Sequence, residues 1–453
     1  MESPRSRDSS ATAARRSFRA ALVVLLCTLP FLGSTPGGPV PVVIPELSQR
    51  INAFSLDLLK HHARSAQAAP NAVLSPQGIF QALALSYLAS GGETRNELAG
   101  TMHFPEDNDR LAGDIGRLRG QIESAAKDKR IEVTVANSAW LDGSYAEFRK
   151  SYTDHLEKAL GVSFRKASFR RPGEASGEIN RWVSRETRGR IKQVIGAEDL
   201  RSRSGPGVVD EPGLVTVNAV YFKADWGSRF EAGATRDLPF HLDRSRTQAV
   251  PTMHQRSVLL HAADDQFQFL EIPYVDGRFS MYIFLPGEIL PVQKLVEPLS
   301  VERITKLKTG AAPCEVDVLL PKFEFRTHVD VKGALCEMGV KAAFDSGKAD
   351  FDRMIVKKLD AYRVYLSDVF HDASIEVHEK GTVATAVTTS VHYSIGCSAA
   401  PSLHPPRVDF HADRPFVFAI VHNESRSVLF AGWISDPKAP AGSAAANTGA
   451  DSR

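Results

Sequence analysis

Residues 364–390 read VYLSDVFHDASIEVHEKGTVATAVTTS, and the second half of this stretch decides the fold. From residue 382 onward, small side chains alternate with β-branched ones, as on the two faces of a strand. The small face would carry Thr382, Ala384, Ala386, Thr388 and Ser390, and the opposite face Val383, Thr385, Val387, Thr389 and Val391. The segment carries no charge, and its residues favour extended backbone. Its small face would let it enter between two existing strands without overpacking a core.

The residues after this segment are unusual for a core strand. Residues 393–406, YSIGCSAAPSLHPP, are rich in turn-forming residues and proline, so the strand-forming segment opens into a long loop and not into a hairpin. Two interpretations remain open from the residues alone. The segment is either a buried strand with a long connection or a strand held outside a sheet that it can later join. An exposed, uncharged strand is a liability that proteins normally avoid.

Composition describes a globular chain with no strongly charged surface overall. The 453 residues are 43% hydrophobic and 24% charged, which is enough to bury a large core. The 55 basic and 53 acidic residues leave a formal net charge of only +2. We therefore expect neither a nucleic-acid nor a membrane partner.

The chain divides into four segments. Arginines precede an apolar run at 20–32, which is shorter than the roughly 20 residues of a membrane-spanning helix and is interrupted by Pro30. We interpret residues 1–34 as a cleaved signal peptide rather than an anchor, and expect a secreted protein. Residues 35–45 form a proline-rich linker, 46–437 the folded domain, and 438–453 a disordered tail.

Within the domain, helices are predicted first and strands later. The pattern at 46–63 places Ile51, Phe54, Leu58 and Leu59 on one helical face, and a second helix is predicted at 78–88. From Leu214 onward, β-branched and aromatic runs such as LVTVNAVYF, FSMYIFLP and FVFAIV predict strands. This segregation favours an α+β domain with antiparallel or mixed sheets.

Catalytic and metal-binding motifs do not stand out in the sequence. It contains no GxSxG, HExxH, GxGxxG or P-loop pattern, so we expect no enzyme activity and no cofactor. Beyond Cys27 of the leader, Cys314, Cys336 and Cys397 form an odd number without metal-ligand spacing, which predicts no metal site and leaves their disulfide state open. Asn423 begins the only N-x-S/T sequon and is a candidate glycosylation site.

Several blocks, in order, resemble the serpin family of serine protease inhibitors. They are NAVLSPQGIFQALALSYLASGGETRNEL at 71–98, VTVNAVYFKADW at 215–226, VYLSDVFHDASIEVHEKGT at 364–382 and DFHADRPFVFAIVHNESRSVLFAGWISDP at 409–437. The resemblance spans 46–437. It implies three β-sheets, about nine helices, an exposed reactive loop near 379–409, and a metastable monomer that inhibits as a suicide substrate. The cleaved loop would insert into the main sheet and hold the protease as a covalent acyl-enzyme complex.

The resemblance also assigns residues to these roles. The reactive-loop hinge would comprise Glu379, Gly381, Thr382, Ala384 and Ala386, and the bond cut by the protease would be Ile395–Gly396, within the range 393–403. Ser75, Asn218 and His371 would form the hydrogen-bonded patch where the main sheet opens.

The chain departs from the family pattern at four neighbouring positions, three in the loop and one beside the sheet-opening patch. Family inhibitors usually carry an acidic residue or Gln at the position of Val383 and alanine at those of Thr385 and Val387, all on the outward face. Gly78 stands where the family often has serine, which makes the hydrogen bonding of the sheet-opening patch uncertain. The outward departures lend support to a non-inhibitory serpin, which would act as a carrier, storage or chaperone-like protein.

Two features bear on partners. Between Gly381 and Pro406 there is no Lys, Arg, Asp or Glu. Ile395 would suit an elastase-like protease and Tyr393 a chymotrypsin-like one, whereas trypsin-like enzymes should be poor targets. Two basic clusters could bind a heparin-like polyanion: Arg165, Lys166, Arg170 and Arg171, and Lys127, Lys129 and Arg130. A solvated charged surface is the preferred explanation, because acidic residues are nearly as abundant in the chain.

Overall fold

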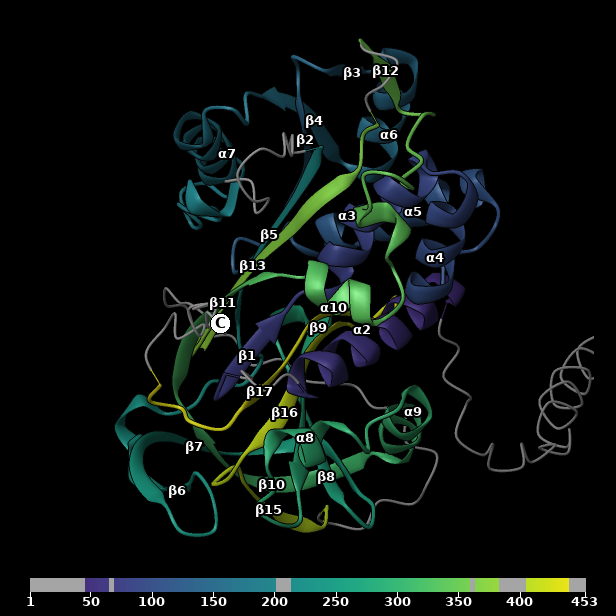
Figure 1. Cartoon of the computed structure of the whole chain (residues 1–453). Helices are drawn as coiled ribbons and strands as arrows, with labels where there is room; N and C mark the ends of the chain where they lie inside the picture. The colour runs from purple at the N-terminus through teal and green to yellow at the C-terminus, as the bar shows by residue number, and fades with distance from the viewer. Residues whose placement is uncertain (1–44, 65–68, 201–212, 359–362, 383–404, 440–453) are drawn as a thin grey trace, which may run out of the picture. The chain divides into compact units, whose positions relative to one another are not determined.

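The structure is a computed structural model that describes residues 45–64, 69–200, 213–358, 363–382 and 405–439 (Figure 1). Within these ranges it contains nine α-helices and three β-sheets, of nine, six and two strands. The α+β class and the arrangement implied by the family resemblance are thereby confirmed. Of the helices in these ranges, none is both long and apolar enough to cross a membrane.

Most helices precede residue 200, as the sequence predicts. The predicted face of the first helix is buried, including Ile51, Phe54, Leu58 and Leu59. The helices are α2 (Glu46–Arg64), α3 (Pro76–Ala89), α4 (Gly92–Met102), α5 (Asn108–Ala125), α6 (Lys150–Leu160), α7 (Pro172–Glu186), α8 (Val292–Val296), α9 (Val301–Gly310) and α10 (Lys332–Glu337).

Strands dominate after residue 213, but four strands also lie among the early helices. These early strands form through pairing with distant partners, so a local helical pattern does not reveal them. The strands are β1 (Asn71–Leu74), β2 (Ile131–Asp142), β3 (Ala146–Phe148), β4 (Val162–Ala167), β5 (Leu214–Asp225), β6 (Arg236–His241), β7 (Thr247–Ala263), β8 (Phe267–Pro273), β9 (Phe279–Pro286), β10 (Ala312–Pro321), β11 (Phe323–Asp330), β12 (Ile355–Lys357), β13 (Leu366–Val377), β14 (Gly381–Thr382), β15 (Arg407–His411), β16 (Phe416–His422) and β17 (Ser427–Ile434).

The six-stranded sheet is mixed. Its order is β11-β13-β5-β2-β4 (Figure 1). The short β14 also pairs with β5. β13 and β5 are parallel neighbours from Leu366↔Leu214 to Ser374↔Tyr221, while β11–β13 and β5–β2 are antiparallel. An additional strand that ran antiparallel to both could pair with β13 on one side and β5 on the other.

Helix α3 packs between the two large sheets. It contacts β5 and β2 on one side and β17 on the other, and every residue of the helix is buried. The Ser75 hydroxyl caps the helix by accepting a hydrogen bond from the Gly78 N–H, and Pro76 occupies the first turn. The cap therefore lies against the six-stranded sheet at its core.

The nine-stranded sheet runs β1-β17-β16-β9-β8-β7-β10-β15, with β6 also paired to β7. The 17-residue strand β7 connects the strands β1, β17, β16, β9 and β8 to the strands β10, β15 and β6. Its last residues pair with β8, and the preceding ones pair with β10 and β6. β15 lies at the edge and runs parallel to β10. This edge strand begins three residues after the undescribed segment 383–404.

Candidate functional site

The chain that leaves β13 turns back and starts a new strand against β5. β13 pairs with β5 as far as Ser374↔Tyr221, and among the described strands its last three residues pair with β11 alone. β14 then runs antiparallel to the end of β5, with Thr382 opposite Ala224. On its other side, Ala224 pairs with Ile131 of β2. β14 therefore lies on the side of β5 that faces β13. The first residues of the predicted small-sided strand thus already extend the sheet.

Glycine is required at the first position of β14. Gly381 has a φ of 155°, and a Cβ added to it would lie 2.2 Å from the carbonyl oxygen of Ala224 and 2.5 Å from the Cα of Asp225. Both are backbone atoms of β5 and cannot rotate away. Only the absence of a side chain lets the chain approach β5 this closely.

Thr382 is fully buried at 0% exposure. Its hydroxyl lies 3.0 Å from the hydroxyl of Tyr274, and the Tyr274 ring stacks on Trp226 with ring centroids 4.5 Å apart. Burial raises the pKa of Tyr274, so its hydroxyl stays protonated and can share a hydrogen bond with Thr382. A pocket of aromatic side chains therefore receives the second residue of β14.

The turn between β13 and β14 is held from several sides. Trp226 donates its backbone N–H to the Lys380 carbonyl at 2.8 Å and its indole N–H to the His378 carbonyl at 2.9 Å. One carboxylate oxygen of Glu379 accepts hydrogen bonds from Thr235 and Lys322. Burial alone would raise the pKa of Glu379, but a hydrogen bond from its own backbone N–H, together with the bonds from Thr235 and Lys322, outweighs burial and holds the pKa below its ordinary value. The turn is therefore fixed by both backbone and charge.

The structure brings Ser75, Asn218 and His371 together below this point. Asn218 on β5 and His371 on β13 lie directly opposite each other. His371 Nδ1 donates to Asn218 Oδ1 at 2.6 Å, and His371 Nε2 accepts the Ser75 backbone N–H at 3.0 Å. Burial lowers the pKa of His371 to about 3, so the ring is neutral. A strand that entered between β13 and β5 would separate His371 from Asn218.

Sequence reasoning missed Asn137, which extends this network to a third strand. Asn218 Nδ2 donates to Asn137 Oδ1 at 2.6 Å. In the sequence, Asn137 stands out only as the single amide of β2, in the half of the strand that is buried. The network also explains Gly78, because a Cβ there would lie 2.7 Å from Asn218 Nδ2 and 2.8 Å from a methyl carbon of Val220. Glycine at residue 78 therefore makes room for the Asn218 amide.

The remaining predicted loop residues lie outside the described ranges. They are Ala384, Ala386, Ile395 and Gly396. Their roles stay predictions.

A family model for serpins, described as serine protease inhibitors, matches residues 49–437. The chain belongs to the serpin family. The leukocyte elastase inhibitor of Xenopus laevis is 32% identical over 401 residues, a match that covers 86% of this chain and 100% of that protein. The family is described by its inhibition of serine proteases, and serpins form complexes with the serine proteases that they target.

Solved serpin structures match over the same region. Native protease nexin-1, solved with heparin, is 29% identical with a TM-score of 0.71, and the match covers 86% of this chain and 99% of that one. Human thyroxine-binding globulin, 23% identical with a TM-score of 0.71 and 86% and 98% coverage, shares the fold.

The sequon of this serpin lies in a turn between β16 and β17 that is well hydrogen-bonded. Asn423 Nδ2 donates to the Gly277 carbonyl at 2.8 Å and to the Ser280 hydroxyl at 2.7 Å, and Ser425 is buried. A glycan on Nδ2 would remove at least one of these bonds. Glycosylation of Asn423 stays a prediction, and it would be made most easily before the turn folds.

The two cysteines within the described ranges, Cys314 and Cys336, are free thiols, and burial raises the pKa of each. Cys397 lies outside these ranges.

Three of the seven basic residues in the two basic clusters are paired with acidic neighbours. Arg165 lies over the ring of Trp140 at 5.9 Å, a contact that leaves its charge in place. Three ion pairs link basic residues of the clusters to acidic neighbours: Lys166–Glu147 at 3.0 Å, Arg171–Glu174 at 2.7 Å and Arg130–Asp128 at 2.6 Å. The pairs weaken the attraction that either cluster would offer to a polyanion.

Proposed function

We propose that this serpin is a secreted suicide-substrate inhibitor of serine proteases. The observation that carries the proposal is β14, since Gly381 and Thr382 already pair with β5 as the start of an extra strand. Export is proposed from the leader pattern at 1–34. Ala384 and Ala386 follow on the same small face of the sequence and are suited to continue the strand.

The proposed mechanism couples cleavage to strand insertion. The catalytic serine of the protease attacks the carbonyl carbon of the residue before the cut, the C–N bond breaks, and the amine of the next residue leaves with a proton. The inhibitor is then held as an ester on the protease. Freed from its C-terminal half, the loop continues from Thr382 between β5 and β13 and carries the protease with it.

Trapping follows because deacylation needs accurate geometry. The triad and oxyanion hole of the protease work only when their groups are placed within fractions of an ångström, so distortion of the protease stops hydrolysis of the ester. The residues of the inhibitor supply no catalysis. Their contribution is the free energy released when each inserted residue gains hydrogen bonds to β5 and β13.

The proposed targets are elastase-like or chymotrypsin-like proteases. The proposed cut lies at Ile395–Gly396, within 393–403, and no basic residue is present there. A trypsin-like pocket would leave its carboxylate without a partner. A relative named leukocyte elastase inhibitor supports the elastase-like class.

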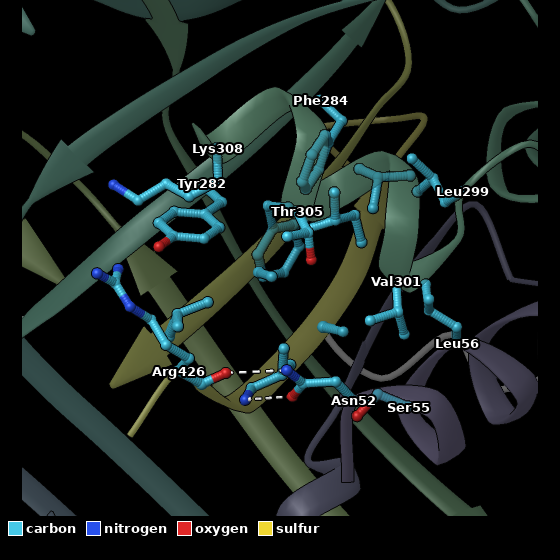
Figure 2. A pocket seen from close by; sticks show the side chains of 17 residues that line it. Asn52, Ser55, Leu56, Tyr282, Phe284, Leu299, Val301, Thr305, Lys308 and Arg426 are labelled. Carbon is cyan, nitrogen blue, oxygen red and sulfur yellow. Dashed lines mark hydrogen bonds between the residues drawn. The ribbon is translucent and has the colours of Figure 1, made fainter. Parts of the chain in front are cut away.

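The apolar cavity next to α2 does not support the carrier function. An apolar cavity lies between α2, α9 and the strands β9, β16 and β17, and Phe284, Leu299 and Val301 help to line it (Figure 2). Its volume is about 70 Å³. Sites for drug-sized ligands usually measure about 300–1,000 Å³. Human thyroxine-binding globulin, which was solved as a complex with a small-molecule ligand, shares only the fold at 23% identity.

A denaturing gel tests the proposed function. We expect the full-length protein, mixed with an elastase or a chymotrypsin, to give a band at the combined mass of the two proteins less the released C-terminal peptide. A protease whose catalytic serine is chemically blocked serves as the control and should give no such band. Cleavage within 393–403 without a stable complex, by proteases of both classes, would refute the proposal.

A further inference from the structure

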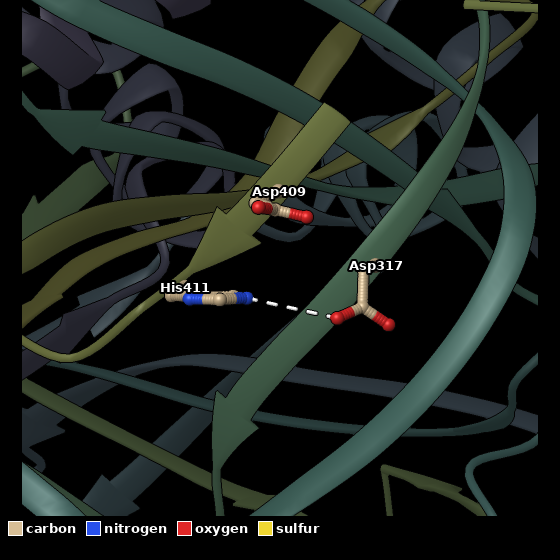
Figure 3. Close-up of side chains that lie close together, drawn as sticks. All are labelled: Asp317, Asp409 and His411. Carbon is tan, nitrogen blue, oxygen red and sulfur yellow. Dashed lines mark ion pairs between the residues drawn. The ribbon is translucent and has the colours of Figure 1, made fainter. Parts of the chain in front are cut away.

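Two aspartates and a histidine meet on one face of the strands β10 and β15 (Figure 3). Asp317 of β10 lies directly opposite Asp409 of β15, and His411 follows two residues later on the same face. One possible ligand atom from each of the three side chains lies within 4.8 Å of the other two. Figure 3 shows the His411 ring directed edge-on toward the Asp317 carboxylate.

The negative charge of this cluster is only partly compensated by its neighbours. Two carboxylates directly opposite each other on neighbouring strands repel. The His411 side chain is 40% exposed, but its Nε2 atom is covered, lies 3.7 Å from Asp317 Oδ2, and makes no hydrogen bond to any described residue. A ring nitrogen and two carboxylates that face one another in this way match the ligand types of a metal ion.

The two oxygens of Asp317 have different surroundings. Oδ1 accepts a hydrogen bond from His254 Nε2 of β7 at 2.7 Å and lies 3.4 Å from the guanidinium of Arg256. Oδ2 faces His411. His254 therefore holds the carboxylate in an orientation that directs its other oxygen toward the cluster, as residues around metal ligands commonly do. Arg256 is 58% exposed, so its charge is well screened by solvent.

We propose that Asp317 Oδ2, a carboxylate oxygen of Asp409 and His411 Nε2 bind one zinc ion, with His254 as the positioning residue. An imidazole with carboxylates favours zinc, whereas calcium and magnesium prefer oxygen ligands alone. Tetrahedral zinc with bonds of about 2.1 Å places its ligand atoms about 3.4 Å apart. Modest side-chain rotations would bring these three residues to that spacing and leave a fourth position for water.

The ion would fasten β15 to β10. β15 is an edge strand whose partner among the described strands is β10 alone, and it follows the reactive-loop segment. Insertion of an uncleaved loop would have to pull β15 away from β10, so zinc would oppose inactivation of the intact inhibitor. This consequence rests on the proposed function, whereas zinc binding itself does not.

Calorimetric titration of the untagged, chelator-treated full-length protein with zinc chloride tests the site. We expect one ion per chain, and no binding of calcium under the same conditions. Asp409→Asn and His411→Ala should each weaken zinc binding at least about 100-fold, and His254→Ala about 10- to 100-fold. Glu315→Gln is the matched control, because Glu315 lies on the same face of β10 but pairs with Arg407. Its affinity should equal that of the wild type.

The proposed site would be overturned if the wild type did not bind zinc. It would also be overturned if Asp409→Asn and His411→Ala bound zinc as tightly as the wild type. Circular dichroism establishes that both variants are folded. Hydrogen exchange tests the clamp, since zinc at 100 times its Kd should slow exchange of the 407–411 amides by up to about 100-fold in the wild type and not in Asp409→Asn. Unchanged exchange would refute the clamp. A failed protease-trapping gel would leave the zinc titration unaffected, so the two proposals fail separately.

Discussion

Replacement of Thr382 by arginine tests the hinge most sharply. The Thr382 side chain is 0% exposed and meets Tyr274 at 3.0 Å. Among the described residues, no Asp or Glu side chain is hydrogen-bonded to Thr382. An arginine at residue 382 would therefore have to be buried without a partner or leave the sheet. We expect Thr382→Arg to convert the inhibitor into a substrate.

The magnitude follows from the burial. An unpaired charge in a protein interior destabilises by about 3 kcal/mol or more. Before cleavage the arginine can avoid this burial by leaving the sheet for solvent, whereas insertion has to bury it. If half or more of the destabilisation is present in the transition state for insertion, insertion slows roughly 10- to 100-fold. Hydrolysis of the acyl-enzyme would then overtake insertion, and most inhibitor molecules would be released in cleaved form.

The assay measures the moles of inhibitor needed to inactivate one mole of an elastase or a chymotrypsin. The ratio should rise several-fold for Thr382→Arg, with cleaved inhibitor in place of the complex on a gel. Lys380→Arg is the matched control, since residue 380 lies in the same turn but is exposed, and its ratio should not change. An unchanged ratio for Thr382→Arg would refute the assignment of residue 382 to the inserting face.

Three further outcomes are expected. Gly381→Ala should detach β14, because the added Cβ would lie 2.2 and 2.5 Å from backbone atoms of β5. The intrinsic fluorescence of the buried Trp226 should then change, and a spectrum identical to that of the wild type would contradict the close approach of Gly381 to β5. Burial lowers the pKa of His371 from 6.5 to about 3, so as the pH falls the unfolded chain binds a proton before the folded chain does. The contribution of His371 to the free energy of unfolding is therefore complete above about pH 6.5 and is lost progressively toward pH 3. At pH 5 the loss is roughly 2 kcal/mol, and Tm measured from pH 7.5 to 5 should depend less on pH in His371→Asn than in the wild type; parallel curves would argue against a neutral buried ring. Trypsin should be trapped at least about 100-fold more slowly than elastase or chymotrypsin, and rapid stoichiometric trapping through 393–403 would refute the predicted specificity.

The fold class could be predicted because local patterns and the final structure agree. The run at 214–222 is a continuous apolar and β-branched segment, and β5 is indeed buried along almost its whole length. The helical pattern at 46–63 similarly matches the buried face of α2. In these segments the same residues determine both the local conformation and the core.

The site could be predicted only in part because its decisive contacts are non-local. Alternation in the sequence assigned Thr382 to a small inward face, but its contact with Tyr274 depends on where β13 leaves β5. Asn137 joins the His371 network through the register of β2 against β5. Asp317 and Asp409 are 92 residues apart and meet only because β10 and β15 pair in parallel. Strand register of this kind is not encoded in any short window of sequence.

Insertion of the cleaved loop as an additional strand is the central step of the proposed mechanism. The melting temperature of the cleaved protein tests this step most directly. A metalloprotease, which forms no acyl-enzyme, can be used to cut the chain once within 393–403. About ten inserted residues that each gain roughly 1 kcal/mol of hydrogen bonding would add on the order of 10 kcal/mol, so Tm of a domain of this size should rise by roughly 10 °C or more. A Tm that is unchanged or lowered after the cut, as for an ordinary nicked surface loop, would contradict insertion between β5 and β13.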